Sequence, residues 1–296
     1  MQLIFLGTSS MVPTKTRNHS AVLLQFEGEG ILFDCGEGTQ RQLKVAGIKP
    51  TAITRILLTH WHGDHVLGLP GLIQTLSGSE YQGTLRIYGP PGTKQRVQDM
   101  FKVFIFDKRL DFEVYDVGEG ECIDSKRFGV NAYALEHPAT CLGYRFEEKD
   151  RRRMNLAIIR KLGIPDGPLL GRLQDGQAIT WKDKKVTPAE ATTLVKGKVI
   201  SYVVDTLPCT GGLNAAKDAD LLIAESTYSG KLEEKGETYG HMTATQAARL
   251  ASQAGAKRLI LTHFSQRYKD TNELVEEAGT YFPNVSAADD FMKVKL

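Results

Sequence analysis

The sequence of 296 residues lacks several features that would identify whole classes of protein. No apolar run approaches the roughly 20 residues that span a bilayer, and the apolar start Met1–Leu6 is too short for a signal peptide. The four cysteines form no CxxC pair, which argues against a thiolate zinc site and against a disulfide framework. We therefore expect a protein of the reducing cytoplasm without membrane association. The cysteines are Cys35, Cys122, Cys141 and Cys209.

The chain also lacks an excess of charge of one sign. Its 37 basic and 35 acidic side chains leave a formal net charge of +2. Any contact with a polyanion must therefore depend on a local basic patch and not on the whole surface. An apolar content of 41% and a charged content of 24% are ordinary globular values, so we expect one large α/β domain or two smaller ones.

The most informative segment that is present is His60-Trp-His-Gly-Asp-His65, directly after the apolar run Arg55–Thr59. Imidazole and carboxylate together suit a borderline divalent cation such as zinc. His60 and His62 are two positions apart, so in extended chain they point the same way. Asp64 and His65 follow where a helix-like run begins and should face elsewhere, which suggests two metals. The alternative is a loop with surface histidines.

Several short apolar runs share one design, because each is strand-like and ends in a polar residue. Any single such residue is equally well explained as a turn that ends a strand. Together they describe a site built on the rim of packed sheets, with loops carrying the functional groups. The runs are Leu3–Leu6, the hairpin Ala21–Phe26 and Gly30–Phe33, Ile56–Leu58, Val130–Leu135, Val199–Val204, Leu221–Ala224 and Arg258–Leu261.

The candidate metal ligands at these strand ends exceed what one tetrahedral zinc can use. Two metals that share one carboxylate fit the count, and Asp205 is the natural bridge. The candidates are His60, His62, Asp64, His65, His137, Asp205 and His263.

A two-metal site can hold a bridging hydroxide and act on a phosphodiester. Asp64 is the candidate to hold and deprotonate the water. His241 is outside the ligand set and could protonate the leaving oxygen, with Glu225 orienting its imidazole. His241 lies just before a predicted helix, 243–252, in which Thr243 and Gln246 have capping-box spacing. The alternative for His241 is a surface residue at the start of that helix.

Residues 147–197 interrupt the pattern of strands. The stretch begins with charged residues that include Arg151, Arg152 and Arg153. It also contains further lysines and two turn-like segments, Gly163–Pro168 and Gly171–Gly176. Its composition predicts turns and one short amphipathic helix, Met154–Lys161. Such a run is either a solvated face or a clamp for a phosphate backbone.

These residues resemble the metallo-β-lactamase superfamily and, more closely, the ribonuclease Z family of tRNA 3′-processing endonucleases. The H-x-H-x-D-H of His60–His65 resembles the superfamily signature. Several further segments resemble motifs of the ribonuclease Z family. They are Phe5–Ser9 with Pro13 and Arg17-Asn18, Phe33–Gln40, Ala224–Thr227, His241 and Thr262–Tyr268. Gly167-Pro168 resembles the family's flexible arm, or exosite, which grips tRNA.

The resemblance implies an α/β fold, a four-layer αβ/βα metallo-β-lactamase sandwich formed by one domain over 1–296. An inserted flexible tRNA-binding arm would occupy 147–197, with Arg151, Arg152, Arg153, Gly167 and Pro168 as substrate-binding residues. One Zn²⁺ would be held by His60, His62 and His137. The other would be held by Asp64, His65 and His263, with Asp205 bridging.

The implied function is removal of the 3′ trailer from precursor tRNA by a zinc-dependent endoribonuclease, a homodimer, with Asp64 as proton acceptor assisted by Glu225 and His241. A hydrolase of small molecules on the same fold, such as a phosphodiesterase, lactonase or thioesterase, is one alternative. A non-catalytic RNA-binding subunit is another.

Overall fold

The computed structural model describes residues 1–105 and 109–296, which form two compact units. The first, which we call the body, comprises Met1–Asp124, Val130–Phe146 and Val199–Leu296. The second, which we call the inserted unit, comprises Ser125–Gly129 and Glu147–Lys198. Each unit is described by itself below.

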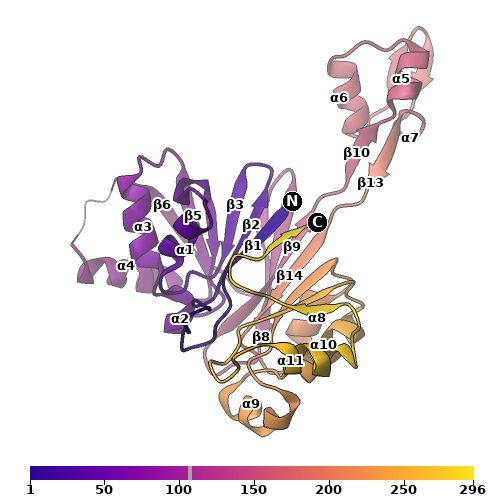
Figure 1. Ribbon diagram of the computed structural model, residues 1–296. Coiled ribbons are helices and arrows are strands. Elements are labelled where there is room, and N and C mark those ends of the chain that lie inside the picture. The colour runs from indigo at the N-terminus through magenta and orange to yellow at the C-terminus, as the bar shows by residue number, and fades with distance from the viewer. Residues whose placement is uncertain (106–108) are drawn as a thin grey trace. The chain divides into compact units, whose positions relative to one another are not determined.

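Two seven-stranded sheets are the framework of the body (Figure 1). The first has the order β18-β1-β2-β3-β4-β5-β6 and the second the order β17-β16-β15-β14-β9-β8-β7. The strands of the first sheet are β1 (Gln2–Gly7), β2 (Ala21–Phe26), β3 (Glu29–Phe33), β4 (Arg55–Leu57), β5 (Thr84–Gly89), β6 (Asp111–Asp116) and β18 (Lys293–Lys295). Those of the second are β7 (Gly120–Asp124), β8 (Phe128–Leu135), β9 (Cys141–Glu148), β14 (Val199–Val203), β15 (Leu221–Glu225), β16 (Leu259–Thr262) and β17 (Val285–Ala287).

Central strands are apolar at consecutive positions because both faces of each sheet are covered. In β1, for example, Leu3, Ile4, Phe5 and Leu6 are all buried. Aromatic side chains pack between the two sheets, where the ring of Phe33 lies 5.3 Å from that of Tyr202, centroid to centroid. The expected sandwich is therefore confirmed in its layers, with sheet facing sheet and helices outside.

Helices cover the outer face of each sheet (Figure 1). The helices α1 (Thr39–Val45), α3 (Leu69–Gly78) and α4 (Thr93–Val103) lie on the first sheet, and α8 (Thr210–Ala216), α10 (Ala244–Ala254) and α11 (Asn272–Gly279) on the second. Shorter pieces are η1 (Pro50–Ala52), α2 (Gly63–Val66), η2 (Gly230–Leu232) and α9 (Glu233–Tyr239). None of the helices in the described part of the chain is both long and apolar enough to cross a membrane.

Two local predictions are confirmed in detail. The helix after His241 is α10, and both hydrogen bonds of the capping box between Thr243 and Gln246 are formed. The hairpin between β2 and β3 turns at Glu27 and Gly28, whose φ angles are 47° and 85°. Two adjacent residues with positive φ are what a type I′ hairpin turn requires, and glycine adopts such angles without strain.

The sheet topology decides where the chemical groups meet. Strands β14, β15 and β16 run parallel to one another. Since parallel strands end at the same edge of a sheet, Asp205, Glu225 and His263 come together although they are far apart in the sequence. The segment after β4 (Arg55–Leu57) brings His60 to the same place.

The inserted unit has its own small core. It contains the antiparallel pair β10 (Arg151–Met154) and β13 (Thr192–Val195), the hairpin β11 (Ile179–Trp181) and β12 (Lys184–Val186), and the helices α5 (Leu156–Leu162), α6 (Pro168–Gln174) and α7 (Pro188–Ala191). Six buried residues form its centre: Ile159, Ile164, Leu173, Ile179, Val186 and Ala191.

The boundary predicted for the short helix of this unit was wrong. Met154 ends strand β10, and the helix begins at Leu156 because the side chain of Asn155 accepts a hydrogen bond from the backbone N–H of Ile158. This N-cap stops the helix from extending back to the arginines.

Candidate metal centre

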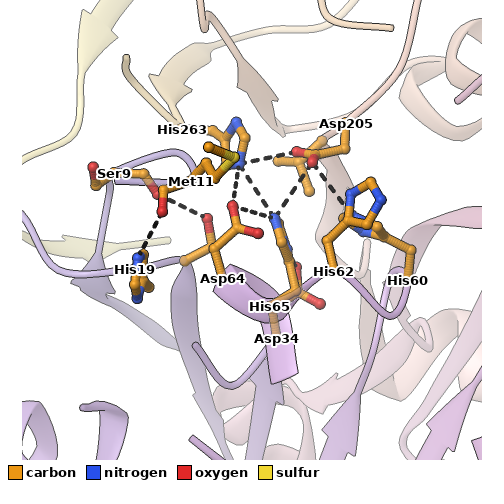
Figure 2. Close-up of polar contacts among 12 residues, drawn as sticks. Ser9, Met11, His19, Asp34, His60, His62, Asp64, His65, Asp205 and His263 are labelled. Atoms are coloured by element: carbon orange, nitrogen blue, oxygen red, sulfur yellow. Dashed lines mark hydrogen bonds and ion pairs between the residues drawn. The ribbon is translucent and has the colours of Figure 1, made fainter. Parts of the chain in front are cut away.

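The predicted ligands converge on one rim of the body (Figure 2). One group consists of His60, His62, His137 and Asp205, and a second consists of Asp64, His65 and His263. Within each group the potential ligand atoms lie no more than 4.8 Å from one another. His60 and His62 thus fall in one group and Asp64 and His65 in the other, as their spacing suggested, while the family resemblance implied the places of His137 and His263.

Asp205 lies between the two groups. Its Oδ2 atom is 3.4 Å from Nε2 of His60 in the first group and 3.4 Å from Nε2 of His65 in the second. Its Oδ1 atom is 3.1 Å from Nε2 of His263. A carboxylate in this position can donate one oxygen to each of two neighbouring cations.

The distances between facing imidazole nitrogens show whether a metal ion would fit between them. Nε2 of His65 is 3.2 Å from Nε2 of His263, and Nε2 of His137 is 3.3 Å from Nδ1 of His62. A tetrahedral ion with nitrogens at about 2.0–2.1 Å spaces two ligands by about 3.3 Å. Nε2 of His60 is buried and has no hydrogen-bond partner among the described residues. The donor atoms therefore fit divalent metal.

Buried outer partners orient the imidazoles. Nδ1 of His65 donates to Asp34 at 2.8 Å, Nδ1 of His60 to Thr59 at 3.0 Å, and Nδ1 of His263 to Thr227 at 3.0 Å. Nδ1 of His137 donates to the carbonyl of Gly240 at 2.9 Å. With one nitrogen protonated in this way, the lone pair of the other is directed to the centre.

Two of these partners also join neighbouring groups. Thr59 donates its hydroxyl hydrogen to Asp34, and Thr227 donates to Glu225. Sequence reasoning missed Asp34, Thr59 and Thr227 as members of the site. The available signal was position, because Asp34 follows a strand end and Thr59 directly precedes His60.

Three residues of the centre have left-handed backbone conformations. The φ angles of Asp34, Asp205 and His263 are 58°, 54° and 59°. Such angles are uncommon outside glycine, and they persist where the surrounding structure holds them, often at functional sites. In each case the chain turns sharply after a strand and directs the side chain to the rim.

The charge states of His60 and Asp64 suit metal ligands, whereas the surrounding carboxylates raise the pKa of His65 well above its ordinary value against the effect of burial. Burial and the neighbouring His65 lower the pKa of His60 well below its ordinary value, so its imidazole is neutral. Burial alone would raise the pKa of Asp64, but His65 and hydrogen bonding with His263 lower it below its ordinary value. A neutral imidazole and an ionised carboxylate are the forms that bind metal.

His241 and Glu225 form the predicted pair. Nδ1 of His241 lies 3.0 Å from Oε2 of Glu225, which is fully buried. Burial alone would lower the pKa of His241, but the Glu225 carboxylate raises it to about 9. His241 also belongs to a third group of potential ligands with Asp205 and His263. A protonated imidazole has no free lone pair, so the raised pKa favours a proton donor over a ligand.

A cavity of about 690 Å³ opens onto this centre. It is lined by Asp64, Asp205 and His241 together with two basic side chains, Lys235 and Arg267. The guanidinium of Arg267 lies 5.0 Å from the ring centroid of Tyr228. An anionic substrate that enters this cavity would therefore meet positive charge beside the candidate ligands.

The residues predicted to bind substrate in the inserted unit lie on short elements. Arg151, Arg152 and Arg153 belong to strand β10, in which Arg151 and Arg153 are exposed and Arg152 is half-buried. Arg152 donates to Thr192 on the paired strand. Since side chains alternate across a strand, the three arginines do not share one face. Gly167 and Pro168 begin helix α6.

Comparison with known proteins places the chain among RNA-processing enzymes. It is 42% identical to "Ribonuclease Z" of Methanothermobacter thermautotrophicus, over 100% of this chain and 97% of that protein. It is 40% identical to "Ribonuclease BN" of Escherichia coli K12, over 98% of each. The family model described as "Anti-Pycsar protein Apyc1" matches residues 1–114.

The fold agrees with these sequence relatives. The crystal structure of the short form of human tRNase Z superposes with a TM-score of 0.73 at 29% identity, and the match covers 100% of this chain and 99% of that one. An identity above 40% along the whole length, together with the metallo-β-lactamase sandwich, leads to one conclusion: this chain belongs to the ribonuclease Z family.

Proposed function

We propose that this protein is an endoribonuclease that removes the 3′ trailer from precursor tRNA. The cut leaves a 3′-hydroxyl on the tRNA and a 5′-phosphate on the trailer. The observation that carries the proposal is the cluster of seven candidate ligands on one rim of a ribonuclease Z-family chain. The names of the relatives, ribonuclease Z and tRNase Z, supply the substrate class.

The proposed cofactor is Zn²⁺, two ions per chain. His60, His62 and His137 would hold one ion and Asp64, His65 and His263 the other, with Asp205 able to serve both. Bound zinc lowers the pKa of water to about 7 and withdraws charge from a phosphodiester. The facing nitrogens at 3.2 and 3.3 Å support this assignment.

The side chains around the ions move the protons. Asp64 lines the cavity and accepts the proton of the attacking water. His241, protonated through its contact with Glu225, donates a proton to the 3′-oxygen that leaves. Glu225 is a positioning residue, because it also accepts hydrogen bonds from the backbone of Thr206 and the hydroxyl of Thr227.

The inserted unit is the proposed tRNA-binding arm. Arg151, Arg152 and Arg153 supply charge for phosphates, and Gly167-Pro168 supplies the turn that begins α6. Exposure of Arg151 and Arg153 supports a role for these two in particular. Arg152, half-buried against Thr192, contributes less.

We further propose that the protein acts as a homodimer in the cytoplasm, as the family resemblance implies. Size-exclusion chromatography with light scattering tests the first statement, and twice the mass of one chain is the expected result. Fractionation of cells that express the tagged protein tests the second.

The direct test uses precursor tRNA with a 3′ trailer. The purified protein should release the trailer, and a chelator should stop the reaction until zinc is restored. Asp64→Ala should be inactive, whereas Asp99→Asn on the exposed face of α4 should cleave like the wild type. Equal cleavage by Asp64→Ala would contradict the proposed mechanism.

A second experiment separates an RNA enzyme from a hydrolase of small phosphodiesters. Arg151 and Val195 are paired across β10 and β13, and Lys196 bonds to Asp150, so a short Gly-Ser linker can replace residues 151–195. The shortened protein should lose tRNA cleavage and keep its activity on a small phosphodiester. Undiminished tRNA cleavage would show that the inserted unit is not the binding arm.

A further inference from the structure

Exposed apolar side chains gather at the mouth of the metal cavity. Met11, Leu67 and Tyr239 all line it, and they are 74%, 59% and 55% exposed. Single exposed apolar residues are common on protein surfaces. Val12, at 36% exposed, lines the cavity as well, and the three most exposed of these side chains form a local apolar rim beside the histidines and carboxylates. We call Met11, Leu67 and Tyr239 the apolar rim.

Each residue of the rim is anchored beside the metal centre. Leu67 directly follows α2, which carries Asp64 and His65, and its backbone N–H bonds to Gly63. Tyr239 is the last residue of α9 and precedes Gly240, whose carbonyl accepts the hydrogen bond of His137. The rim is therefore held by the same segments that hold the candidate ligands.

The loop that carries Met11 is also fixed. His19 donates to the Met11 carbonyl at 3.1 Å (Figure 2), and the hydroxyl of Ser9 donates to the carbonyl of Val12 at 2.7 Å. The backbone N–H of the preceding residue, Ser10, donates to the carbonyl of Phe264 at 3.0 Å, so the backbone beside Met11 is tied to a distant segment of the body. The Met11 side chain is therefore exposed although the backbone of its loop is held in place by hydrogen bonds.

We infer that the apolar rim binds the nucleobases that flank the scissile phosphate. This inference rests on the proposed function, because an RNA strand that presents a phosphodiester to the centre must place its neighbouring bases at the mouth of the cavity. Base faces are the apolar part of RNA, and they stack on aromatic side chains. Lys235 and Arg267 in the same cavity suit the adjoining phosphates.

The composition of the rim predicts how it recognises RNA. Methionine and leucine side chains have no hydrogen-bonding groups that could read a base edge, and a tyrosine ring stacks on any base. The rim therefore selects for the presence of bases next to the cut and not for their identity.

The test compares a precursor tRNA with a version that has abasic nucleotides on both sides of the cleavage point. On the normal substrate, Tyr239→Ala should lower kcat/KM about tenfold, the loss expected for one stacked base, mainly through KM. Tyr239→Phe should restore the wild-type value, because a phenyl ring stacks equally well. Met11→Ala should have a smaller effect in the same direction.

The abasic substrate distinguishes stacking from a structural role. The kcat/KM of the wild type on this substrate should fall at least as far as that of Tyr239→Ala falls on the normal one, because the contacts of Met11 and Leu67 are lost as well. On the abasic substrate Tyr239→Ala should be no slower than the wild type. Tyr281→Ala is the matched control, since Tyr281 is 44% exposed and lies against Arg249 outside the cavity.

The possible failures are distinct. An equal loss for Tyr239→Ala on both substrates, or no loss on either, would overturn the inference and leave the proposed function standing. A wild-type protein that does not cleave the normal precursor at all would overturn the proposed function and this inference with it.

Discussion

The metal centre of the body and the arginines of the inserted unit use polar side chains in opposite ways. In the centre, His60, His65 and His263 are fully buried, and each has one ring nitrogen bonded to a buried partner. In the inserted unit, Arg151 and Arg153 are exposed on a four-residue strand. Chemistry at a phosphorus atom needs atoms held in place, whereas contact with a phosphate backbone needs only charge within reach.

The same contrast holds for the cores that support the two regions. In the body, each of the two large sheets packs against its covering helices. Each of these two sheet–helix interfaces contains many buried residues. The inserted unit relies on a small buried cluster. We therefore expect single substitutions to abolish function in the body, and to have graded or local effects in the inserted unit.

The largest effect is expected for Asp205→Asn. The amide keeps the shape of the side chain but removes the charge that lies between His60 and His65. Trailer cleavage should fall by a factor of about 10³ or more, within the range for loss of a key electrostatic group, and metal content measured by atomic emission should fall as well. Full activity with unchanged metal content would show that the two ligand groups do not depend on a shared carboxylate.

The next effect concerns the pair of His241 and Glu225. His241→Ala should lower kcat about 10²-fold or more, as for loss of a general acid. Since the acid must be protonated, activity in the wild type should decline as the pH rises through the His241 pKa of about 9. In Glu225→Gln the alkaline decline should move towards the ordinary imidazole value of about 6.5.

A matched measurement sharpens this prediction. Small phosphodiesters with an activated leaving group need little protonation of the leaving oxygen, so His241→Ala should impair their hydrolysis much less than tRNA cleavage. An alkaline decline at the same pH in wild type and Glu225→Gln would contradict the assignment of the acid.

The third prediction tests whether the inserted unit unfolds independently of the body. Leu173 is fully buried in the inserted unit, and Leu173→Ala should cost that unit about 3 kcal/mol. Hydrogen exchange should then accelerate in residues 151–195 and stay unchanged in β4 and the metal centre. The control is Leu156→Ala, at a 59% exposed position of the same unit, which should leave hydrogen exchange unchanged in both units. Faster exchange throughout the body would show that the two units unfold together.

The smallest effects are expected for the arginines. Arg151→Ala and Arg153→Ala should each weaken tRNA binding severalfold and reduce the slope of log K against log salt concentration by about 0.7–0.9. Arg152→Ala should have less effect because this side chain is half-buried against Thr192. Filter binding over a salt series measures all three. Equal slopes in wild type and variants would indicate a solvated strand with no contact to phosphate.

Local sequence patterns predicted a large share of the molecule. The hairpin of β2 and β3 and the capping box of α10 depend on residues that are close in the sequence, so spacing alone identified them. The error at Met154 arose in the same way, because a run of apolar and basic residues does not reveal that Asn155 caps the helix. Alternation along β10 likewise separates three consecutive arginines that looked like one patch.

Residue types and their spacing were enough to predict a metal site, because imidazole and carboxylate groups gathered at strand ends favour a divalent cation. How these groups are held could be learned only from the folded chain. Asp34 bonds to His65 and receives a hydrogen bond from Tyr202, and Met11, Leu67 and Tyr239 meet around one cavity. The physical reason is that such contacts join residues far apart in the chain, and their proximity follows from the order of strands in the packed sheets.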